Sequence, residues 1–145
     1  MIRDLKIEDS KELKSINKEQ LGYDFPMDLT KDKLTKLLKD PSHHFFKGFE
    51  DETSHKILGY VHAEVYETIY FNTMFNVLAL AVSKENEKQG IGEKLMKALE
   101  EEARNRRYEA IRLNSGMTRE GAHKFYEKIG YNNNKNQKRF IKFVD

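Results

Sequence analysis

The stretch LALAVSKENEKQGIGEKLMKALEEEA, residues 78–103, joins an apolar run to an amphipathic run through two glycines. The run that ends in LALAV is almost continuously apolar, as is typical of a strand covered on both faces. After the glycines, apolar residues recur at helical spacing, which predicts a helix over residues 91–106. Gly90 and Gly92 therefore stand at a strand-to-helix junction, where glycine lets the backbone come close to another group.

The group that these glycines approach could be a phosphate, because the amides at the start of a helix suit an anion. Two familiar phosphate-binding loops do not fit this sequence. A P-loop continues as Gly-Lys-Ser or Gly-Lys-Thr, whereas Gly92 is followed by Glu93 and Lys94. A Rossmann fingerprint has a third glycine where this chain has Leu95. Two glycines at the start of a helix are also common in ordinary loops that bind nothing. The sequence around them is therefore needed to choose between a phosphate-binding loop and an ordinary loop.

The composition limits the class of protein. A chain of 145 residues predicts one domain over residues 1–145, and 38% hydrophobic with 34% charged residues fits a globular protein. The absence of cysteine excludes disulfides, a thiol nucleophile and thiolate metal sites. A net charge of +2 is too small to indicate nucleic acid or a membrane as a partner. With no membrane-length apolar run and no secretory signal, we expect a cytoplasmic protein.

The order of predicted elements is a strand, two helices, three strands, a helix, a strand, a helix and a last strand. The first helix is expected to begin at Asp9 or Ser10. The second is expected to begin with Thr30 as its cap and to stop before Pro41. The other helices are expected at residues 91–106 and 119–130, and the strands at 1–5, 43–51, 56–67, 72–82, 109–114 and 138–144.

The glycine stretch, followed by IRLNSGMTREGAHKFYEKIGYNNNKNQKRFIKF, resembles the GNAT family of acyl-CoA-dependent N-acetyltransferases. The resemblance covers residues 74–143. The pattern R-x-x-A-H-x-F-Y-x-x-x-G-Y, residues 119–131, is most similar to the branch with aminoalkylphosphonate and small-amine acetyltransferases. It implies an α/β (α+β) fold: a mixed, mostly antiparallel sheet of six to seven strands, flanked by about four helices and opening as a V beside Val82.

In this family the glycine loop binds the pyrophosphate of coenzyme A, which implies acetyl-CoA as the cofactor. The family pattern has Arg or Gln where this chain has Glu87, so Lys88 or Gln89 is expected to substitute. The strand before the loop would pair with the pantetheine arm, and the N–H of Val82 would stabilise the oxyanion. The cofactor residues implied by the resemblance are Leu80, Ala81, Val82, Lys88, Gln89, Gly90, Ile91, Gly92, Glu93, Lys94, Asn114 and Arg119.

The resemblance also implies catalytic residues. Tyr126 matches the tyrosine that protonates the leaving thiolate, although it could instead be an ordinary packing residue beside Phe125. An alkyl amine with a pKa of about 10.4 is mostly protonated at pH 7, so a base is needed. The family often has a glutamate where this chain has Ala79, so Glu64 on the adjacent strand is the candidate base. The alternative for Glu64 is a solvated strand carboxylate.

The expected reaction is acetyl transfer to a primary amine of a small molecule or peptide by direct attack in a ternary complex. The alternative is a non-catalytic acyl-CoA-binding regulatory protein. No metal site is expected from the histidine spacing, and a homodimer is one option for the assembly. The basic residues near the C-terminus are interpreted as part of a solvated edge strand and not as an RNA-binding site. The candidate acceptor pocket consists of Tyr23, Asp24, Phe25 and Tyr66, and Tyr70 could also contribute to it.

Overall fold

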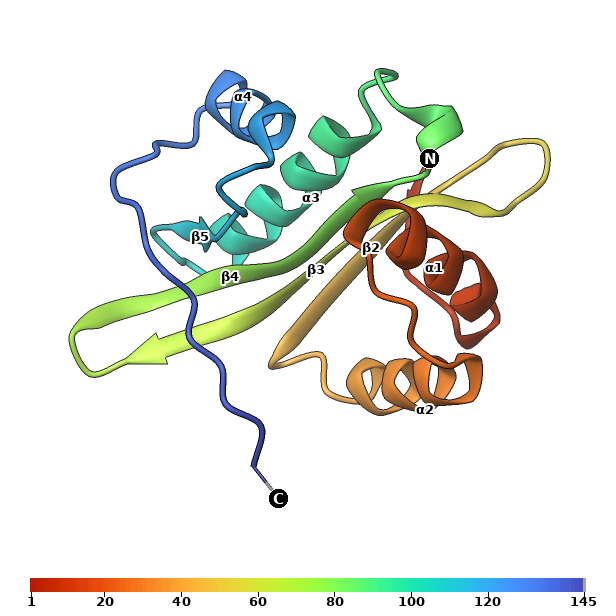
Figure 1. Ribbon diagram of the computed structural model, residues 1–145, viewed down its shortest axis with the longest axis horizontal. Helices are drawn as coiled ribbons and strands as arrows, with labels where there is room; N and C mark the ends of the chain where they lie inside the picture. Colours follow the sequence, from red (N-terminus) through yellow and green to blue (C-terminus); the bar gives the residue numbers. More distant parts are fainter. Residues whose placement is uncertain (145) are drawn as a thin grey trace. The chain divides into compact units, whose positions relative to one another are not determined.

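The computed structural model describes residues 1–144 and contains a five-stranded sheet with four α-helices (Figure 1). The mixed α/β class is as predicted, but the prediction of six to seven strands was wrong for the described residues. The helices are α1 (Ser10–Ile16), α2 (Met27–Leu38), α3 (Ile91–Asn105) and α4 (Glu120–Lys128). The strands lie side by side in chain order as β1 (Ile2–Arg3), β2 (His44–Glu50), β3 (Ile57–Thr68), β4 (Phe71–Val82) and β5 (Ile111–Leu113).

The chain divides into two compact units. The first unit, residues 1–113, holds the whole sheet together with α1, α2 and α3. The second unit begins at residue 114 and holds α4. The prediction of a single domain over residues 1–145 stays a prediction. None of the described helices is long and apolar enough to cross a membrane.

The pairing of β4 leaves part of one edge open. All neighbouring strands are antiparallel except β4 and β5, which are parallel. β5 pairs only with residues 75–77 of β4, ending with Val77 opposite Leu113. On the other side, β3 pairs with β4 as far as Val82, with a bulge at Leu78. Residues 78–82 therefore have a strand neighbour on one side only within the first unit.

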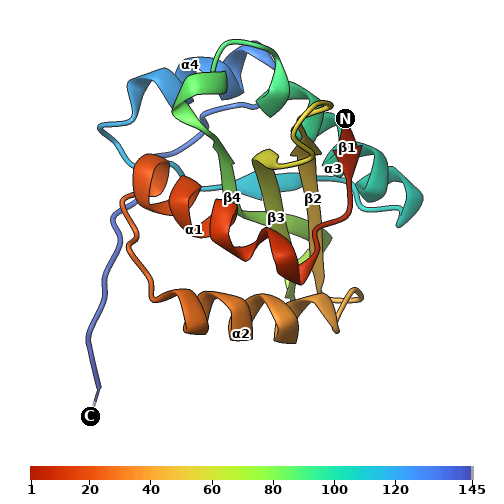
Figure 2. The same ribbon diagram turned by 90° about the vertical axis from the view of Figure 1, so that its right-hand side faces the viewer.

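The first unit has helices on both faces of its sheet (Figure 2). α1 and α2 cover one face, where Leu13, Ile16 and Leu34 pack with Tyr60 and Ala81 in one apolar cluster. α3 covers the other face, and it presents the fully buried side chains of Leu95, Met96 and Leu99. The apolar spacing of residues 91–106 had predicted this helix, which ends at Asn105.

The first helix begins at Ser10 after Asp9, as predicted, whereas the start of the second helix differs from the prediction. A π-helical turn, Asn17–Leu21, extends α1 and ends at Gly22, whose φ of 76° is left-handed. The second helix begins at Met27 after Pro26, so the prediction of Thr30 as its cap was wrong. The Thr30 hydroxyl donates instead to the carbonyl of Pro26, 2.9 Å away, from within the first turn of the helix. Proline at the start of a helix removes an N–H that has no helical partner there.

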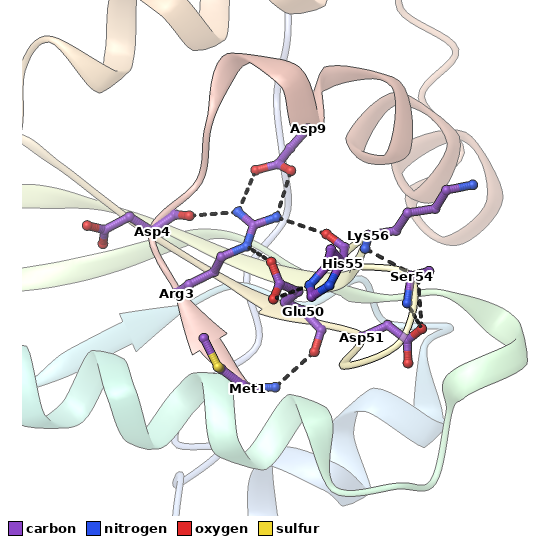
Figure 3. Close-up of polar contacts among 9 residues, drawn as sticks. All are labelled: Met1, Arg3, Asp4, Asp9, Glu50, Asp51, Ser54, His55 and Lys56. Atoms are coloured by element: carbon purple, nitrogen blue, oxygen red, sulfur yellow. Dashed lines mark hydrogen bonds and ion pairs between the residues drawn. The ribbon is translucent and has the colours of Figure 1, made fainter.

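A partly buried ion network joins β1 to the start of α1 and to the end of β2 (Figure 3). Arg3 donates to both carboxylate oxygens of Asp9 at 2.9 Å and to Glu50 at 2.6 Å. Burial alone would raise the pKa of Asp9, but the bonds from Arg3 and from the Lys6 amide hold that pKa below its usual value. The bond from Arg3 likewise lowers the pKa of Glu50. This network fixes α1 against the sheet.

The second unit contains α4 and an extended tail. α4 ends at Lys128, and Gly130 follows with a φ of 103°, as predicted for a glycine after a helix. No strand forms over residues 138–144, so the prediction of a closing strand there was wrong. Phe140 and Phe143 are largely exposed. Alternating apolar residues favour a strand, but a strand also needs a partner to pair with, and none of the described residues pairs with this segment.

Candidate functional site

The junction between β4 and α3 is an exposed loop that ends in a left-handed glycine. Gly90 caps α3 with φ 78° and ψ 9°, and a Cβ there would meet nothing within 4 Å. Glycine is therefore favoured at residue 90 by backbone conformation and not by lack of space. In the described chain no side-chain hydrogen bond caps the start of α3. Its first amides are thus available to an anion.

The end of the first helix holds the start of this loop. The Glu19 carboxylate accepts a hydrogen bond from the Lys84 amide at 2.6 Å, and Gln20 donates to the Glu87 carboxylate at 2.9 Å. Glu87, the residue that departs from the family pattern, is therefore bound to Gln20. The sequence analysis missed Glu19 and Gln20, because neither residue belongs to a motif and their contacts span more than 60 positions.

The open edge of β4 leads directly into this loop. Leu80 and Val82 are half-buried and Ala81 is buried. Gly59 on β3 permits close packing here, since a Cβ at that position would lie 3.0 Å from the Ala81 carbonyl. The bulge lies at Leu78, at the start of the open edge and before the residues that the resemblance implied for the pantetheine arm. An extended ligand with amide groups could add to this edge as a strand does.

A row of polar side chains crosses four strands beside the open edge. His44 lies opposite Glu64, Glu64 opposite Asn76, and Asn76 opposite Arg112. Arg112 donates to the side-chain oxygen of Asn76 at 2.7 Å, and Asn76 donates to Glu64 at 2.8 Å. The Arg112 guanidinium lies 4.7 Å from the centre of the Tyr66 ring. The structure thus brings the predicted Glu64 and Tyr66 together and adds Asn76 and Arg112, which the sequence analysis missed.

A histidine pair continues this polar row. The ring nitrogens of His44 and His62 are 3.0 Å apart, and His62 stacks on Phe46 with ring centroids 4.0 Å apart. Burial, together with His44, lowers the pKa of His62 to about 3. His62 is therefore neutral at physiological pH. Among the described residues no group of side chains is arranged to hold a metal ion.

The predicted acceptor loop is exposed. Tyr23 and Phe25 retain 66% and 47% of their accessible surface. Asp24 is bound to Lys14 at 2.7 Å and lies 3.7 Å from Lys18, and the bond from Lys14 lowers its pKa. The charge of Asp24 is therefore already compensated by lysines, which weakens the attraction of Asp24 for a cationic ligand.

The second unit contains the predicted acid. Tyr126 lies on α4 with its ring against Phe125 and Tyr131. Burial raises the pKa of Tyr126, although the nearby charge of Arg119 opposes this effect. The phenol therefore stays protonated at neutral pH and can act as a proton donor. Arg119 caps α4 and is exposed, and Asn114 is exposed just after β5.

Comparison with known proteins identifies the family. The model of the acetyltransferase (GNAT) family matches residues 10–131. This chain belongs to the GNAT family. Members of this family are acyl-CoA-dependent N-acetyltransferases. No curated protein matches the sequence.

Solved structures show the same GNAT fold at low sequence identity. An aminoglycoside antibiotic 6'-N-acetyltransferase from Acinetobacter haemolyticus matches with a TM-score of 0.82 and 11% identity, covering 100% of this chain and 99% of the other. Glucosamine-6-phosphate N-acetyltransferase from Arabidopsis thaliana matches with a TM-score of 0.77 and 17% identity over 100% and 98%. Ribosomal-protein-alanine N-acetyltransferase from Brucella melitensis matches with a TM-score of 0.76 and 21% identity over 99% of both chains.

Proposed function

We propose that this GNAT protein transfers the acetyl group of acetyl-CoA to a primary amine of a small molecule or peptide. One observation carries the proposal: the open edge of β4, residues 78–82, leads through the loop of residues 83–90 to the start of α3, which no described side chain caps. The edge offers backbone partners for the amide groups of the pantetheine arm. The amides at Gly90 and beyond offer donors and a partial positive charge for the pyrophosphate.

The reaction is direct attack in a ternary complex. The amine nitrogen attacks the thioester carbonyl carbon, a C–N bond forms, and the C–S bond breaks to leave the amide product and the thiolate of coenzyme A. Glu64, directly or through water, accepts the proton that the amine loses. Tyr126 donates its proton to the thiolate. The N–H of Val82 stabilises the tetrahedral oxyanion, and the amides at the Leu78 bulge are further candidates for this role.

The acceptor is a small or peptide amine in this proposal. The three related structures are named for an aminoglycoside, a sugar phosphate and a protein alanine, so the fold accommodates acceptors of very different size. The half-buried row at Glu64 is the more suitable place for an ammonium group, because the charge of Asp24 is already compensated by Lys14.

The test is a titration of acetyl-CoA followed by a screen of amines for release of free coenzyme A. Turnover of any amine well above hydrolysis of the thioester supports the enzyme. Ala79, at the position of the family's frequent glutamate, favours one other candidate, a non-catalytic regulator that binds acyl-CoA. Binding of acetyl-CoA without turnover of any amine would support that regulator. Absence of acetyl-CoA binding would overturn both functions.

A further inference from the structure

The candidate base Glu64 uses one of its two carboxylate oxygens. Asn76, directly opposite on β4, donates to the Oε2 atom of Glu64 at 2.8 Å. In the part of the chain that the structure describes, the Oε1 atom accepts no hydrogen bond. The Glu64 side chain is half-buried. It therefore has one oxygen held in place and the other available to a ligand or to a water molecule.

This arrangement differs from that of the structural carboxylates in the same unit. Both oxygens of Asp9 accept hydrogen bonds from Arg3 at 2.9 Å. One oxygen of Glu50 accepts from Arg3 at 2.6 Å, and the other lies 3.3 Å from a ring nitrogen of His55. A carboxylate that only holds the fold is expected to use its oxygens in this way, because unsatisfied polar atoms cost free energy where they are desolvated. The unused oxygen of Glu64 thus indicates a role beyond packing.

The orientation of the Asn76 amide follows from its other neighbour, Arg112. A guanidinium has only donors, so Arg112 bonds to the amide oxygen of Asn76, at 2.7 Å. The NH2 group of the amide then faces Glu64, to which it can only donate. The Tyr66 ring, 4.7 Å from the guanidinium, limits the position of Arg112 from another side. Arg112 has a further interaction as well, so its position does not depend on Asn76 alone.

The amide keeps a carboxylate in the form that a base needs. A donor bonded to a carboxylate favours the ionised form, which is the form that accepts a proton. A neutral amide donates more weakly than a guanidinium, so a carboxylate bound to an amide stays a stronger base than one paired with arginine. The other titratable groups of the sheet near Glu64 are His44, opposite it on β2, and His62, two residues earlier on β3. Arg112 lies two strands away on β5.

We infer that Asn76 is a positioning residue for Glu64. Its amide, oriented by Arg112, holds the carboxylate ionised and in one orientation, and it leaves one oxygen for the proton that the acceptor loses. The inference rests on the proposed acetyl transfer, because it assigns a further role at the same site. Asn76 touches none of the reacting atoms and acts through Glu64 alone.

The first test needs no acceptor. NMR follows the acid titration of glutamate side chains labelled with carbon-13, and the Glu64→Gln variant identifies the Glu64 signal. Asn76→Asp keeps the shape of the side chain and an oxygen for Arg112, but it replaces the donor with a second carboxylate. We expect Glu64 in this variant to titrate at a pH about half a unit or more above that in the native protein, because both changes disfavour the ionised form. Asn72→Asp adds the same charge at an exposed position of β4 and should shift the titration little.

The second test measures the consequence for catalysis. The acceptors offered are kanamycin, glucosamine 6-phosphate and a peptide that begins with alanine, and the one with the fastest turnover is used. Asn76→Asp should lower kcat about tenfold or more, because the base is no longer held in place, and should leave the KM for acetyl-CoA unchanged. The acidic limb of the kcat/KM profile should move to higher pH together with the NMR titration of Glu64. A purely structural asparagine would not couple these two measurements.

Two results would overturn the inference: the same titration of Glu64 in the native protein and in Asn76→Asp, or native kcat in that variant. Circular dichroism reports whether each variant folds. Where Asn76→Asp does not fold, Asn76→Ser is uncharged and too short to bridge Glu64 and Arg112, so it should shift the titration in the same direction by a smaller amount. A shifted titration in a protein that turns over none of the acceptors would retain the link between Asn76 and Glu64 and reject the enzyme.

Discussion

Gly90 is the residue at which charge and conformation can be tested separately. Asn and Asp both tolerate a left-handed backbone and have almost the same shape. The Gly90→Asp variant adds a negative charge at the proposed pyrophosphate site, whereas Gly90→Asn does not. We expect Gly90→Asp to raise the Kd for acetyl-CoA at least about tenfold relative to Gly90→Asn, which is roughly 1.4 kcal/mol of binding energy. Calorimetry checks this, and equal affinities in two folded variants would contradict phosphate binding at this loop.

Tyr126 is the second residue-scale test. Burial raises its pKa, so the hydroxyl carries a proton for the leaving thiolate at neutral pH. Tyr126→Phe keeps the ring and removes the proton, and we expect kcat to fall by about 10²–10⁴ with unchanged affinity for acetyl-CoA.

The matched control is Tyr108→Phe, which removes a hydroxyl from a residue just after α3 that packs on Phe75 and belongs to no proposed site. It should leave kcat unchanged. Near-native turnover by Tyr126→Phe, under conditions where chemistry limits the rate, would remove Tyr126 from the mechanism.

At the scale of elements, the end of the first helix and the loop before α3 act together. Gln20 binds Glu87, the acidic residue where the family pattern has Arg or Gln. Glu87→Gln removes a negative charge near the proposed pyrophosphate site and retains an oxygen for Gln20. We expect this variant to bind acetyl-CoA a few-fold more tightly, with a smaller difference at high salt because salt screens exposed charges.

Titrations of acetyl-CoA at low and high salt check this prediction. Glu101→Gln, on the exposed side of α3, makes the same charge change far along the helix and should leave the affinity unchanged. A weaker Kd for Glu87→Gln would show instead that the carboxylate helps to order the loop.

At the scale of the whole first unit, the Arg3 network makes stability depend on pH. The folded state lowers the pKa of Asp9 and of Glu50, so both carboxylates stabilise the protein above their ordinary pKa values of about 3.9 and 4.3. That stability is lost as the pH falls through the lower folded pKa values. We expect the free energy of unfolding in urea to fall from pH 6 toward pH 3.

The Arg3→Leu variant tests the cause of this dependence. It leaves the carboxylate of Asp9, a residue that is 6% exposed, without its cation, so we expect a loss of about 2 kcal/mol or more at pH 7. The loss should shrink toward pH 3, because a protonated Asp9 needs no cation. Urea unfolding at each pH measures both effects. An equal loss at every pH would show that Arg3 stabilises the protein by packing alone.

The local patterns of the sequence determined α3, the long strands β3 and β4, the glycine-containing junction between β4 and α3, and the family motif around Tyr126. These features depend on the side-chain period of one element or on the conformation of one residue, so neighbouring residues suffice to specify them. The same reasoning failed for residues 138–144. Their alternating apolar and polar residues favour a strand, but this pattern does not show whether another strand is available to pair with it.

Only the tertiary structure decided which residues meet. The row from His44 to Arg112 depends on the register of four strands, and a shift of one residue in any strand would turn its side chain to the other face. The bond between Gln20 and Glu87 and the bulge at Leu78 likewise depend on how distant segments pack. The sequence alone therefore predicted a cofactor loop and a candidate base, whereas strand register placed Asn76 and Arg112 beside that candidate base.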